Sequence, residues 1–142
     1  MKNALITIAS PEEPKDWEQL IASASRRPVF ISAPAGSMAL LSFRTLSTLL
    51  NHVQYEATEM TEDDGSVTLS LDAMDIAVTA GTLAGAKDAL ASEILEYAEE
   101  YYSNFETYSA APNRSKHLPY VMKALISNTI REVENSMVCR HG

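Results

Sequence analysis

The sequence has few of the residues on which catalytic and metal sites usually depend. It contains 3 histidines, 1 cysteine and 5 glycines among 142 residues. The histidines, His52, His117 and His141, are scattered, and no two stand at metal-ligand spacing. There is no G-x-S-x-G motif and no glycine-rich loop that would hold phosphate. We therefore expect a protein that is not an enzyme and that needs no metal or cofactor.

Disulfides and long apolar runs are also missing. The single cysteine, Cys139, cannot form a disulfide within the chain, which is typical of a reducing compartment. No apolar run approaches the roughly 18–20 residues that span a bilayer. The start, MKNALITIASPEEP, has too short an apolar run for a secretory signal. We expect a cytoplasmic protein without a membrane segment, in which Cys139-Arg140-His141 is a frayed tail rather than a metal site.

Basic residues are nearly absent from the middle of the chain. Residues 1–50 carry five basic and four acidic side chains, and residues 111–142 carry five basic and two acidic ones. Residues 51–110 carry one basic side chain, Lys87, against thirteen acidic ones. Such a segment repels nucleic acid and attracts a basic protein. Improved solubility is the alternative explanation for the same charge.

The first fifty residues predict a β-α-β-β-α order. Strands are expected near residues 5–8, 29–31 and 38–41, with a turn at 34–37. Ser10 and Glu13 form a capping box before the first helix, and Ser42 caps the second. The two helices carry apolar stripes formed by Trp17, Leu20, Ile21 and Ala24, and by Leu46, Leu49, Leu50 and Val53. A core this small usually needs a partner chain.

The remaining residues predict a β-β-β-α order with an antiparallel sheet. Strands are expected at 55–61, 67–71 and 74–78, and Asp63-Asp64-Gly65 is a hairpin turn. Thr82 caps a long helix with the apolar stripe Leu83, Ala86, Leu90, Ile94, Tyr97, Tyr101 and Phe105. Pro119 then begins one last helix that carries Met122, Leu125, Ile130, Val133 and Met137. The fold class is α+β, with expected domains at residues 1–53 and 54–142.

The most unusual segment is SAAPNRSKHLPYV, which follows the long helix. Its candidate partner-binding or hinge residues are Asn113, Arg114, Lys116, His117 and Tyr120. As a hinge, its basic side chains would pair with Glu96, Glu99 and Glu100 of that helix. As an interface, its arginine and tyrosines would contact a protein partner. The three glutamates could also be paired catalytic carboxylates, but their helical spacing favours a solvated face.

A nucleic-acid surface is possible only on the first part of the chain. Lys15 lies at the start of the first expected helix, and Arg26 and Arg27 lie at its end. In a two-fold dimer this sparse set doubles and can follow two stretches of phosphate backbone. The alternative is that the arginines simply complement the helix dipole.

Two stretches resemble a known family of antitoxins. The run RRPVFISAPAGSMALLSFRTLSTLL is similar to the start of Phd/YefM-type (prevent-host-death) antitoxins. The later run, with EILEYAEEYY and APNRSKHLPYV, resembles the second domain of a Phd-like family associated with RelE/RelB-type systems. The resemblance implies an N-terminal part that dimerises and binds operator DNA, and a C-terminal part that neutralises a basic RelE-like toxin by stoichiometric binding. It also implies repression of the protein's own operon.

One position departs from the family pattern. Family members commonly carry an arginine just after the second strand, whereas this chain reads Ile31-Ser32-Ala33 there. DNA contacts would then fall to Lys15, Arg26 and Arg27, or DNA binding has been lost.

Two other functions remain as alternatives: a stand-alone transcriptional regulator without a toxin, and a small ligand-binding domain with a tyrosine-lined groove between its last two helices.

Overall fold

The computed structural model describes residues 5–7 and 17–142. The expected capping box at Ser10 and Glu13, and the candidate DNA contact Lys15, lie outside these residues. The chain divides into two compact units, unit 1 (Met1–Leu49) and unit 2 (Leu50–Gly142). Each unit combines helices with its own sheet, so the chain is α+β.

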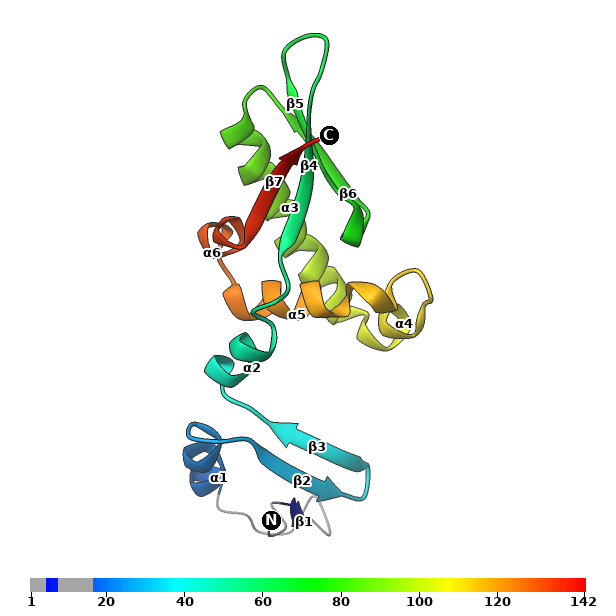
Figure 1. Cartoon of the computed structure of the whole chain (residues 1–142). Coiled ribbons are helices and arrows are strands. Elements are labelled where there is room, and N and C mark those ends of the chain that lie inside the picture. Colours follow the sequence, from blue (N-terminus) through cyan, green and yellow to red (C-terminus); the bar gives the residue numbers. More distant parts are fainter. Residues whose placement is uncertain (1–4, 8–16) are drawn as a thin grey trace. The chain divides into compact units, whose positions relative to one another are not determined.

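Unit 1 is a three-stranded sheet with two short helices (Figure 1). Its elements are β1 (Leu5–Thr7), α1 (Trp17–Ala24), β2 (Val29–Ala33), β3 (Gly36–Leu40) and α2 (Phe43–Leu49). The strand order is β1-β2-β3, with β1 parallel and β3 antiparallel to β2. Gly36 has a φ of 133°, a conformation that glycine adopts with little strain. The Ser42 hydroxyl accepts a hydrogen bond from the Thr45 backbone N–H at 3.1 Å, which confirms the predicted cap of α2.

The core of unit 1 is small. Among its described residues, Leu20, Ala24, Val29 and Ile31 are buried, and Leu40 packs against them. Trp17 and Ile21, which we expected on the buried stripe of the first helix, are 56% and 63% exposed. The reason is that α1 has only 8 residues, so it buries one side chain per turn against the sheet. The sequence therefore predicts more buried apolar residues on this helix than the sheet covers.

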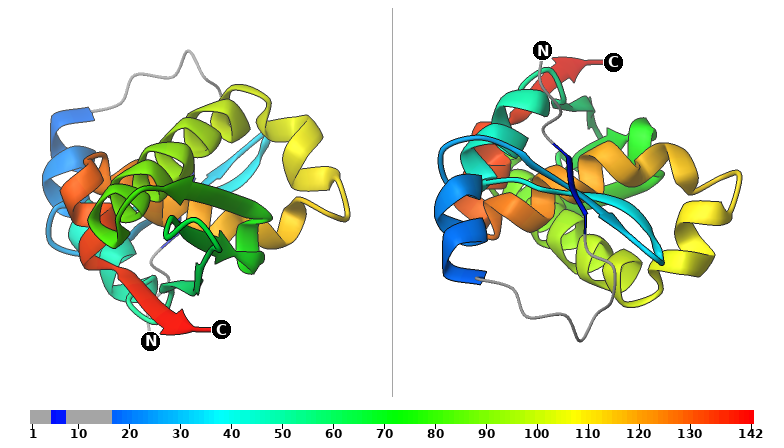
Figure 2. Two further views of the ribbon diagram at one scale, coloured as in Figure 1. Left: turned by 90° about the horizontal axis from the view of Figure 1, so that it is seen from above. Right: turned by 90° about the horizontal axis from the view of Figure 1, so that it is seen from below.

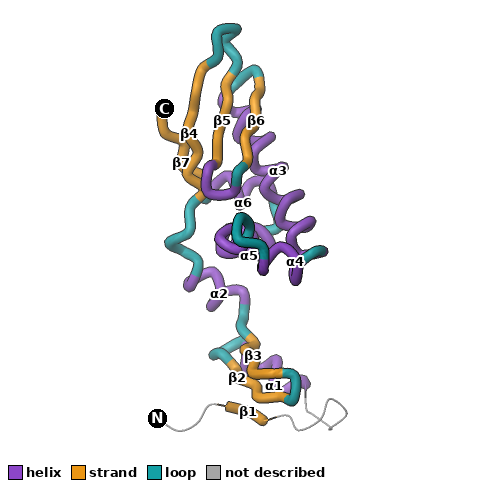
Figure 3. Tube along the Cα trace, turned by 90° about the vertical axis from the view of Figure 1, so that its right-hand side faces the viewer, coloured by secondary structure: helices purple, strands orange, loops and turns teal. Residues whose placement is uncertain are grey.

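Unit 2 is a four-stranded sheet with helices packed against it (Figure 1). Its strands are β4 (Tyr55–Thr61), β5 (Val67–Leu71), β6 (Ile76–Ala80) and β7 (Met137–His141), in the order β6-β5-β4-β7. The first three pair antiparallel, whereas β7 pairs parallel with β4. Gly65, with a φ of 86°, lies in the turn between β4 and β5. The side view in Figure 3 places α3 (Leu83–Ser103) along one side of the sheet.

Helix α3 begins where the sequence predicts and supplies more buried core residues than any other described element of unit 2. The Thr82 hydroxyl accepts a hydrogen bond from the Gly85 backbone N–H at 3.0 Å, which confirms the N-cap. The buried face of α3 consists of Ala86, Leu90, Ala91, Ile94, Ala98 and Tyr101. These side chains pack on Tyr55, Ala57, Leu69 and Leu71 of the sheet and on Val121, Ala124 and Val133 from the C-terminal part.

The helix ends at Ser103, and the chain continues into α4 (Phe105–Ala110). Asn104 interrupts the helix: its backbone N–H donates to the carbonyls of Glu100 and Tyr101, and its side-chain amide donates to the Glu100 carbonyl at 2.9 Å. A short 3-10 turn, η2 (Ser115–His117), then leads into α5 (Leu118–Ser127), which packs across α3 (Figure 2). Phe105, expected on the buried stripe, is instead 38% exposed.

The C-terminal part differs from the single helix that we expected. It forms α5, α6 (Ile130–Asn135) and the strand β7. Asn128 adopts a left-handed conformation with a φ of 60°, which ends α5, and the Thr129 hydroxyl caps α6 through the Glu132 N–H. The expected frayed tail at Cys139 was also wrong, because this residue lies in β7 and packs against the core. Apolar residues keep their helical spacing across the break between α5 and α6, so the sequence pattern did not indicate that break.

Candidate functional site

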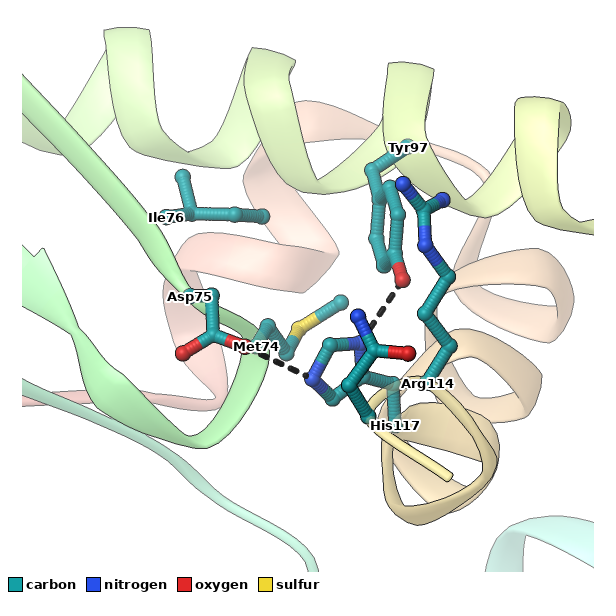
Figure 4. Close-up of a pocket in the computed structure, with 7 residues that line it drawn as sticks. Met74, Asp75, Ile76, Tyr97, Arg114 and His117 are labelled. Carbon is teal, nitrogen blue, oxygen red and sulfur yellow. Dashed lines mark hydrogen bonds and ion pairs between the residues drawn. The ribbon is translucent and has the colours of Figure 1, made fainter. Parts of the chain in front are cut away.

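The most distinctive chemistry in unit 2 surrounds His117, which is only 2% exposed. Its Nδ1 lies 2.7 Å from the Tyr97 hydroxyl of α3, and its Nε2 lies 3.4 Å from an Asp75 carboxylate oxygen (Figure 4). Asp75 follows the 3-10 turn η1 (Asp72–Met74) and has a left-handed φ of 55°. Three segments that are distant in sequence therefore meet at one imidazole.

Burial determines the protonation of these groups. Desolvation lowers the pKa of His117, and although Asp75 opposes this shift, the net direction is downward. Burial likewise raises the pKa of Tyr97, so its hydroxyl keeps its proton. The arrangement that fits these protonation states has Tyr97 donating to Nδ1, while Nε2–H is directed at Asp75. The 3.4 Å separation and the orientation leave Nε2 without a full hydrogen bond.

Arg114 is held by aromatic rings. Its guanidinium lies 4.0 Å from the ring centroid of Tyr108 and 5.8 Å from that of Tyr97. The Arg114 carbonyl accepts a hydrogen bond from the Tyr101 hydroxyl at 3.0 Å. The Tyr108 hydroxyl donates to Glu100 Oε1 at 3.0 Å. We name Asp75, Tyr97, Tyr108, Arg114 and His117 the His117 cluster.

These contacts correct the expected pairing between the basic segment and the acidic helix. Within the described part of the chain, no ion pair joins Arg114, Lys116 or His117 to Glu96, Glu99 or Glu100. The three glutamates are exposed to solvent, and the Arg114 guanidinium lies instead against the tyrosine rings of α3 and α4. Glu100 takes part only through Tyr108.

The other predicted residues of the segment lie in different surroundings. Asn113 lines the same pocket as Arg114 and His117, whereas the Lys116 side chain is exposed. Tyr120 packs elsewhere: its ring centroid is 6.1 Å from that of Tyr55, and its carbonyl accepts a hydrogen bond from the Tyr55 hydroxyl at 2.9 Å. The structure therefore brings together three of the five residues that the sequence singled out.

A pocket of about 190 Å³ opens beside the His117 cluster. It is lined by Met74, Asp75, Ile76, Tyr97, Asn113, Arg114 and His117 (Figure 4). It differs from the expected groove between the last two helices, because one wall comes from η1 and β6. An imidazole between a carboxylate and a hydroxyl can relay a proton, but the raised pKa of Tyr97 makes that hydroxyl a poor nucleophile. The arrangement is better suited to locking α3, η1 and η2 together.

The described residues contain no group of three or more histidine, cysteine or acidic side chains placed to hold a metal ion. Among the same residues, no helix is both long and apolar enough to cross a membrane.

Comparison with known proteins identifies the family. A family model described as an antitoxin of toxin–antitoxin RelE/RelB systems, PHD-like, matches residues 5–138. The chain belongs to the PHD-like antitoxin family. A crystal structure from Syntrophomonas wolfei subsp. wolfei, described as an antitoxin part of a proposed toxin/antitoxin system, is similar with a TM-score of 0.85 and 27% identity. The match covers 96% of this chain and 99% of the other. No curated protein matches the sequence significantly.

The candidate DNA contacts of this PHD-like antitoxin lie at the end of α1. The backbone N–H groups of Arg26 and Arg27 both donate to the Ser23 carbonyl, and both side chains are exposed. The strand β2 ends at Ala33, so its last residue offers no charged side chain to DNA. Two exposed guanidinium groups at one helix end can contact phosphates, but no contact among the described residues fixes the direction of either side chain.

The sequence pattern did not identify some residues of the site. Tyr97 and Tyr101 were assigned to the apolar stripe, although each also uses its hydroxyl as a hydrogen-bond donor. Asp75 carried no signal, because it alternates with Met74 and Ile76 and so falls on the polar side of the strand expected at 74–78. The tyrosine-rich run that precedes the basic segment was the available clue, since arginine and tyrosine commonly stack.

Proposed function

We propose that this protein neutralises a basic RelE-like toxin by stoichiometric binding through unit 2. The observation that carries the proposal is the charge of residues 51–110, where one lysine stands against thirteen acidic residues. A RelE-like toxin binds RNA and therefore presents a basic surface. An acidic partner meets that surface faster than a neutral one and competes with RNA for it.

The acidic side chains of α3 are available for such a partner. Glu93, Glu96 and Glu99 are exposed. Within the described ranges, none of the three forms an ion pair. Pairing them with lysine or arginine of a toxin therefore requires no internal contact to break. This supports an interface role for Glu96 and Glu99 in place of the hinge role.

Unit 1 would act as a Phd/YefM-type homodimerisation domain. Its described core has four buried apolar side chains, while Phe30, Met38, Phe43 and Leu49 are each at least 44% exposed. Burying that surface against a second copy would stabilise a unit that is marginal alone. A dimer would also place two copies of Arg26 and Arg27 on one assembly, which is the arrangement that operator binding and autorepression require.

The proposal is tested by expressing the tagged chain from its native locus and identifying the proteins that copurify with it. We expect one small basic protein, encoded beside this chain, that arrests growth when expressed alone and is harmless when both are expressed. Recovery of the chain without any partner, at abundances where a partner should appear, would contradict the proposal. Tight binding of the isolated chain to its own promoter would then favour the stand-alone regulator.

The DNA part needs a separate measurement. Binding to a duplex from the operon's promoter should weaken in Arg26→Ala/Arg27→Ala, and its logarithmic salt dependence should become shallower. Arg140→Ala in β7, an exposed arginine of unit 2, is the matched control and should bind as the unaltered chain does. Equal binding by all three proteins would show that these arginines do not contact DNA.

A further inference from the structure

We propose that the junction of α3 and α4 is the anchor of the toxin interface, with Tyr102 and Phe105 stacking on a basic side chain of the toxin. We name Tyr102, Phe105, Glu99 and Glu106 the aromatic corner. The inference rests on the proposed function, since it names the surface that would carry it out.

The two rings of the aromatic corner are exposed, in contrast to the buried tyrosine ring beside them. Tyr102 is 68% exposed and Phe105 is 38% exposed, whereas the neighbouring Tyr101 is fully buried. Residues Tyr102 to Thr107 together line a surface hollow of about 400 Å³. A long, fully helical segment would have carried Phe105 onto the buried side, one turn after Tyr101. The break at Asn104 is what directs this ring to the surface.

Phe105 of the aromatic corner is held in place through Tyr101, which contacts Arg114 of the His117 cluster. The ring of Phe105 meets the edge of the Tyr101 ring, with centroids 5.9 Å apart and planes at 71°. Tyr101 is in turn fixed to the Arg114 carbonyl. Tyr108 of α4 lies under the Arg114 guanidinium and donates to Glu100 of α3, which ties the two helices together. A ring that is already positioned, as that of Phe105 is, loses little conformational entropy on binding.

The charge around these rings indicates the chemistry of the occupant. From residue 88 to residue 113 the sequence contains six acidic residues and no lysine, arginine or histidine. Glu99 lies one helical turn before Tyr102, and Glu106 lines the same hollow. Neither glutamate forms an ion pair within the part of the chain that the structure describes.

The next basic residue along the sequence, Arg114, does not pair with these glutamates. The guanidinium of Arg114 lies over the ring of Tyr108 and near that of Tyr97, the second of which is drawn in Figure 4. An arginine or lysine from a partner would find here an aromatic face for cation–π contact and carboxylates for pairing. Aromatic residues that lie central to a charged rim are the usual hot spots of protein interfaces. The chemistry fits a basic protein rather than a second copy of this acidic unit.

The test measures affinity for the toxin that copurifies with the chain. We expect Tyr102→Ala and Glu99→Lys each to weaken binding by about tenfold or more. Tyr102→Phe keeps the ring and should bind within about threefold of the unaltered chain. The matched controls are Met60→Ala, an exposed apolar residue of β4, and Glu132→Lys, an exposed glutamate of α6 outside residues 51–110. Both controls should bind as the unaltered chain does.

The outcomes separate this inference from the proposed function. If the unaltered chain binds the toxin and Tyr102→Ala and Glu99→Lys bind equally well, the inference fails and the proposed function stands. If Tyr102→Ala changes the oligomeric state in light scattering and leaves toxin affinity intact, the aromatic corner is a self-association surface and the inference also fails. If the unaltered chain does not bind the toxin, the proposed function fails first and the inference fails with it.

Discussion

A histidine that is buried between a carboxylate and a hydroxyl contributes to stability in a pH-dependent way. Desolvation holds the pKa of His117 below its usual value, against the opposing effect of Asp75 and with the support of Lys116 and Arg114. Since the unfolded chain then takes up the proton at higher pH than the folded one, protonation favours unfolding. The contribution is present above the unfolded pKa of about 6.5 and is lost as pH falls through the folded pKa.

We therefore predict that the free energy of unfolding in urea declines, as pH falls below about 6.5, more steeply in the unaltered chain than in His117→Gln. The control is His52→Gln, which alters an exposed histidine and should preserve the steep decline. Parallel pH profiles for the unaltered chain and His117→Gln would mean that other groups dominate the titration.

The Tyr97 hydroxyl has an energetic role that can be measured on its own. Tyr97→Phe removes the donor to His117 Nδ1 and leaves a buried nitrogen without a partner, so we expect a loss of about 1–3 kcal/mol in the free energy of unfolding. Tyr102→Phe makes the same change on an exposed ring and should cost less than about 0.5 kcal/mol. Equal effects in the two variants would show that the contact to His117 is not stabilising.

At the scale of single elements, the break between α5 and α6 depends on one residue. Asn128 has a left-handed backbone, which a β-branched side chain resists. Asn128→Val should lower the free energy of unfolding by about 1–2 kcal/mol, whereas Asn128→Gly should change it by less than about 1 kcal/mol. Both values come from urea denaturation. A tolerated valine would indicate that α5 and α6 can join into one helix.

The same elements show how far the sequence predicts the fold. The alternation of Val67, Leu69 and Leu71 and the Thr82 cap are local signals, and the corresponding strand and helix form where they indicate. Strand β7 gave no such signal, because Met137 continued the helical spacing of Val133. Its strand conformation comes from pairing with β4, which is distant in sequence. Tertiary pairing decided the conformation there, and local propensity did not.

The candidate site follows the same rule. Arg114 and His117 stood out because they are close together in an otherwise acidic region. Their real partners, Asp75 and the tyrosines of α3 and α4, are brought in by the fold, and composition pointed instead to glutamates. The exposed ring of Phe105 was likewise hidden, since helical spacing placed it on the buried stripe.

At the scale of the whole molecule, the two units differ in how much apolar surface they bury. Unit 2 has a continuous core that joins the sheet to α3, α5 and α6, whereas the described residues of unit 1 contain only the four buried side chains named above. We predict that residues 50–142 alone unfold cooperatively in urea. Residues 1–49 alone should show the circular dichroism signal of folded helix and strand only at concentrations where light scattering detects a dimer. A folded monomer of residues 1–49 would contradict the dimer proposal.

The parallel pairing of β4 with β7 also constrains the order in which unit 2 folds. β4 and β5 can form a hairpin from neighbouring residues, whereas β7 can reach β4 only after the helices between them are in place. Until then β4 is an open sheet edge with unpaired backbone groups. During refolding at high protein concentration, pairing of β4 with another chain would therefore compete with the docking of β7. The yield of native protein would fall as the protein concentration rises.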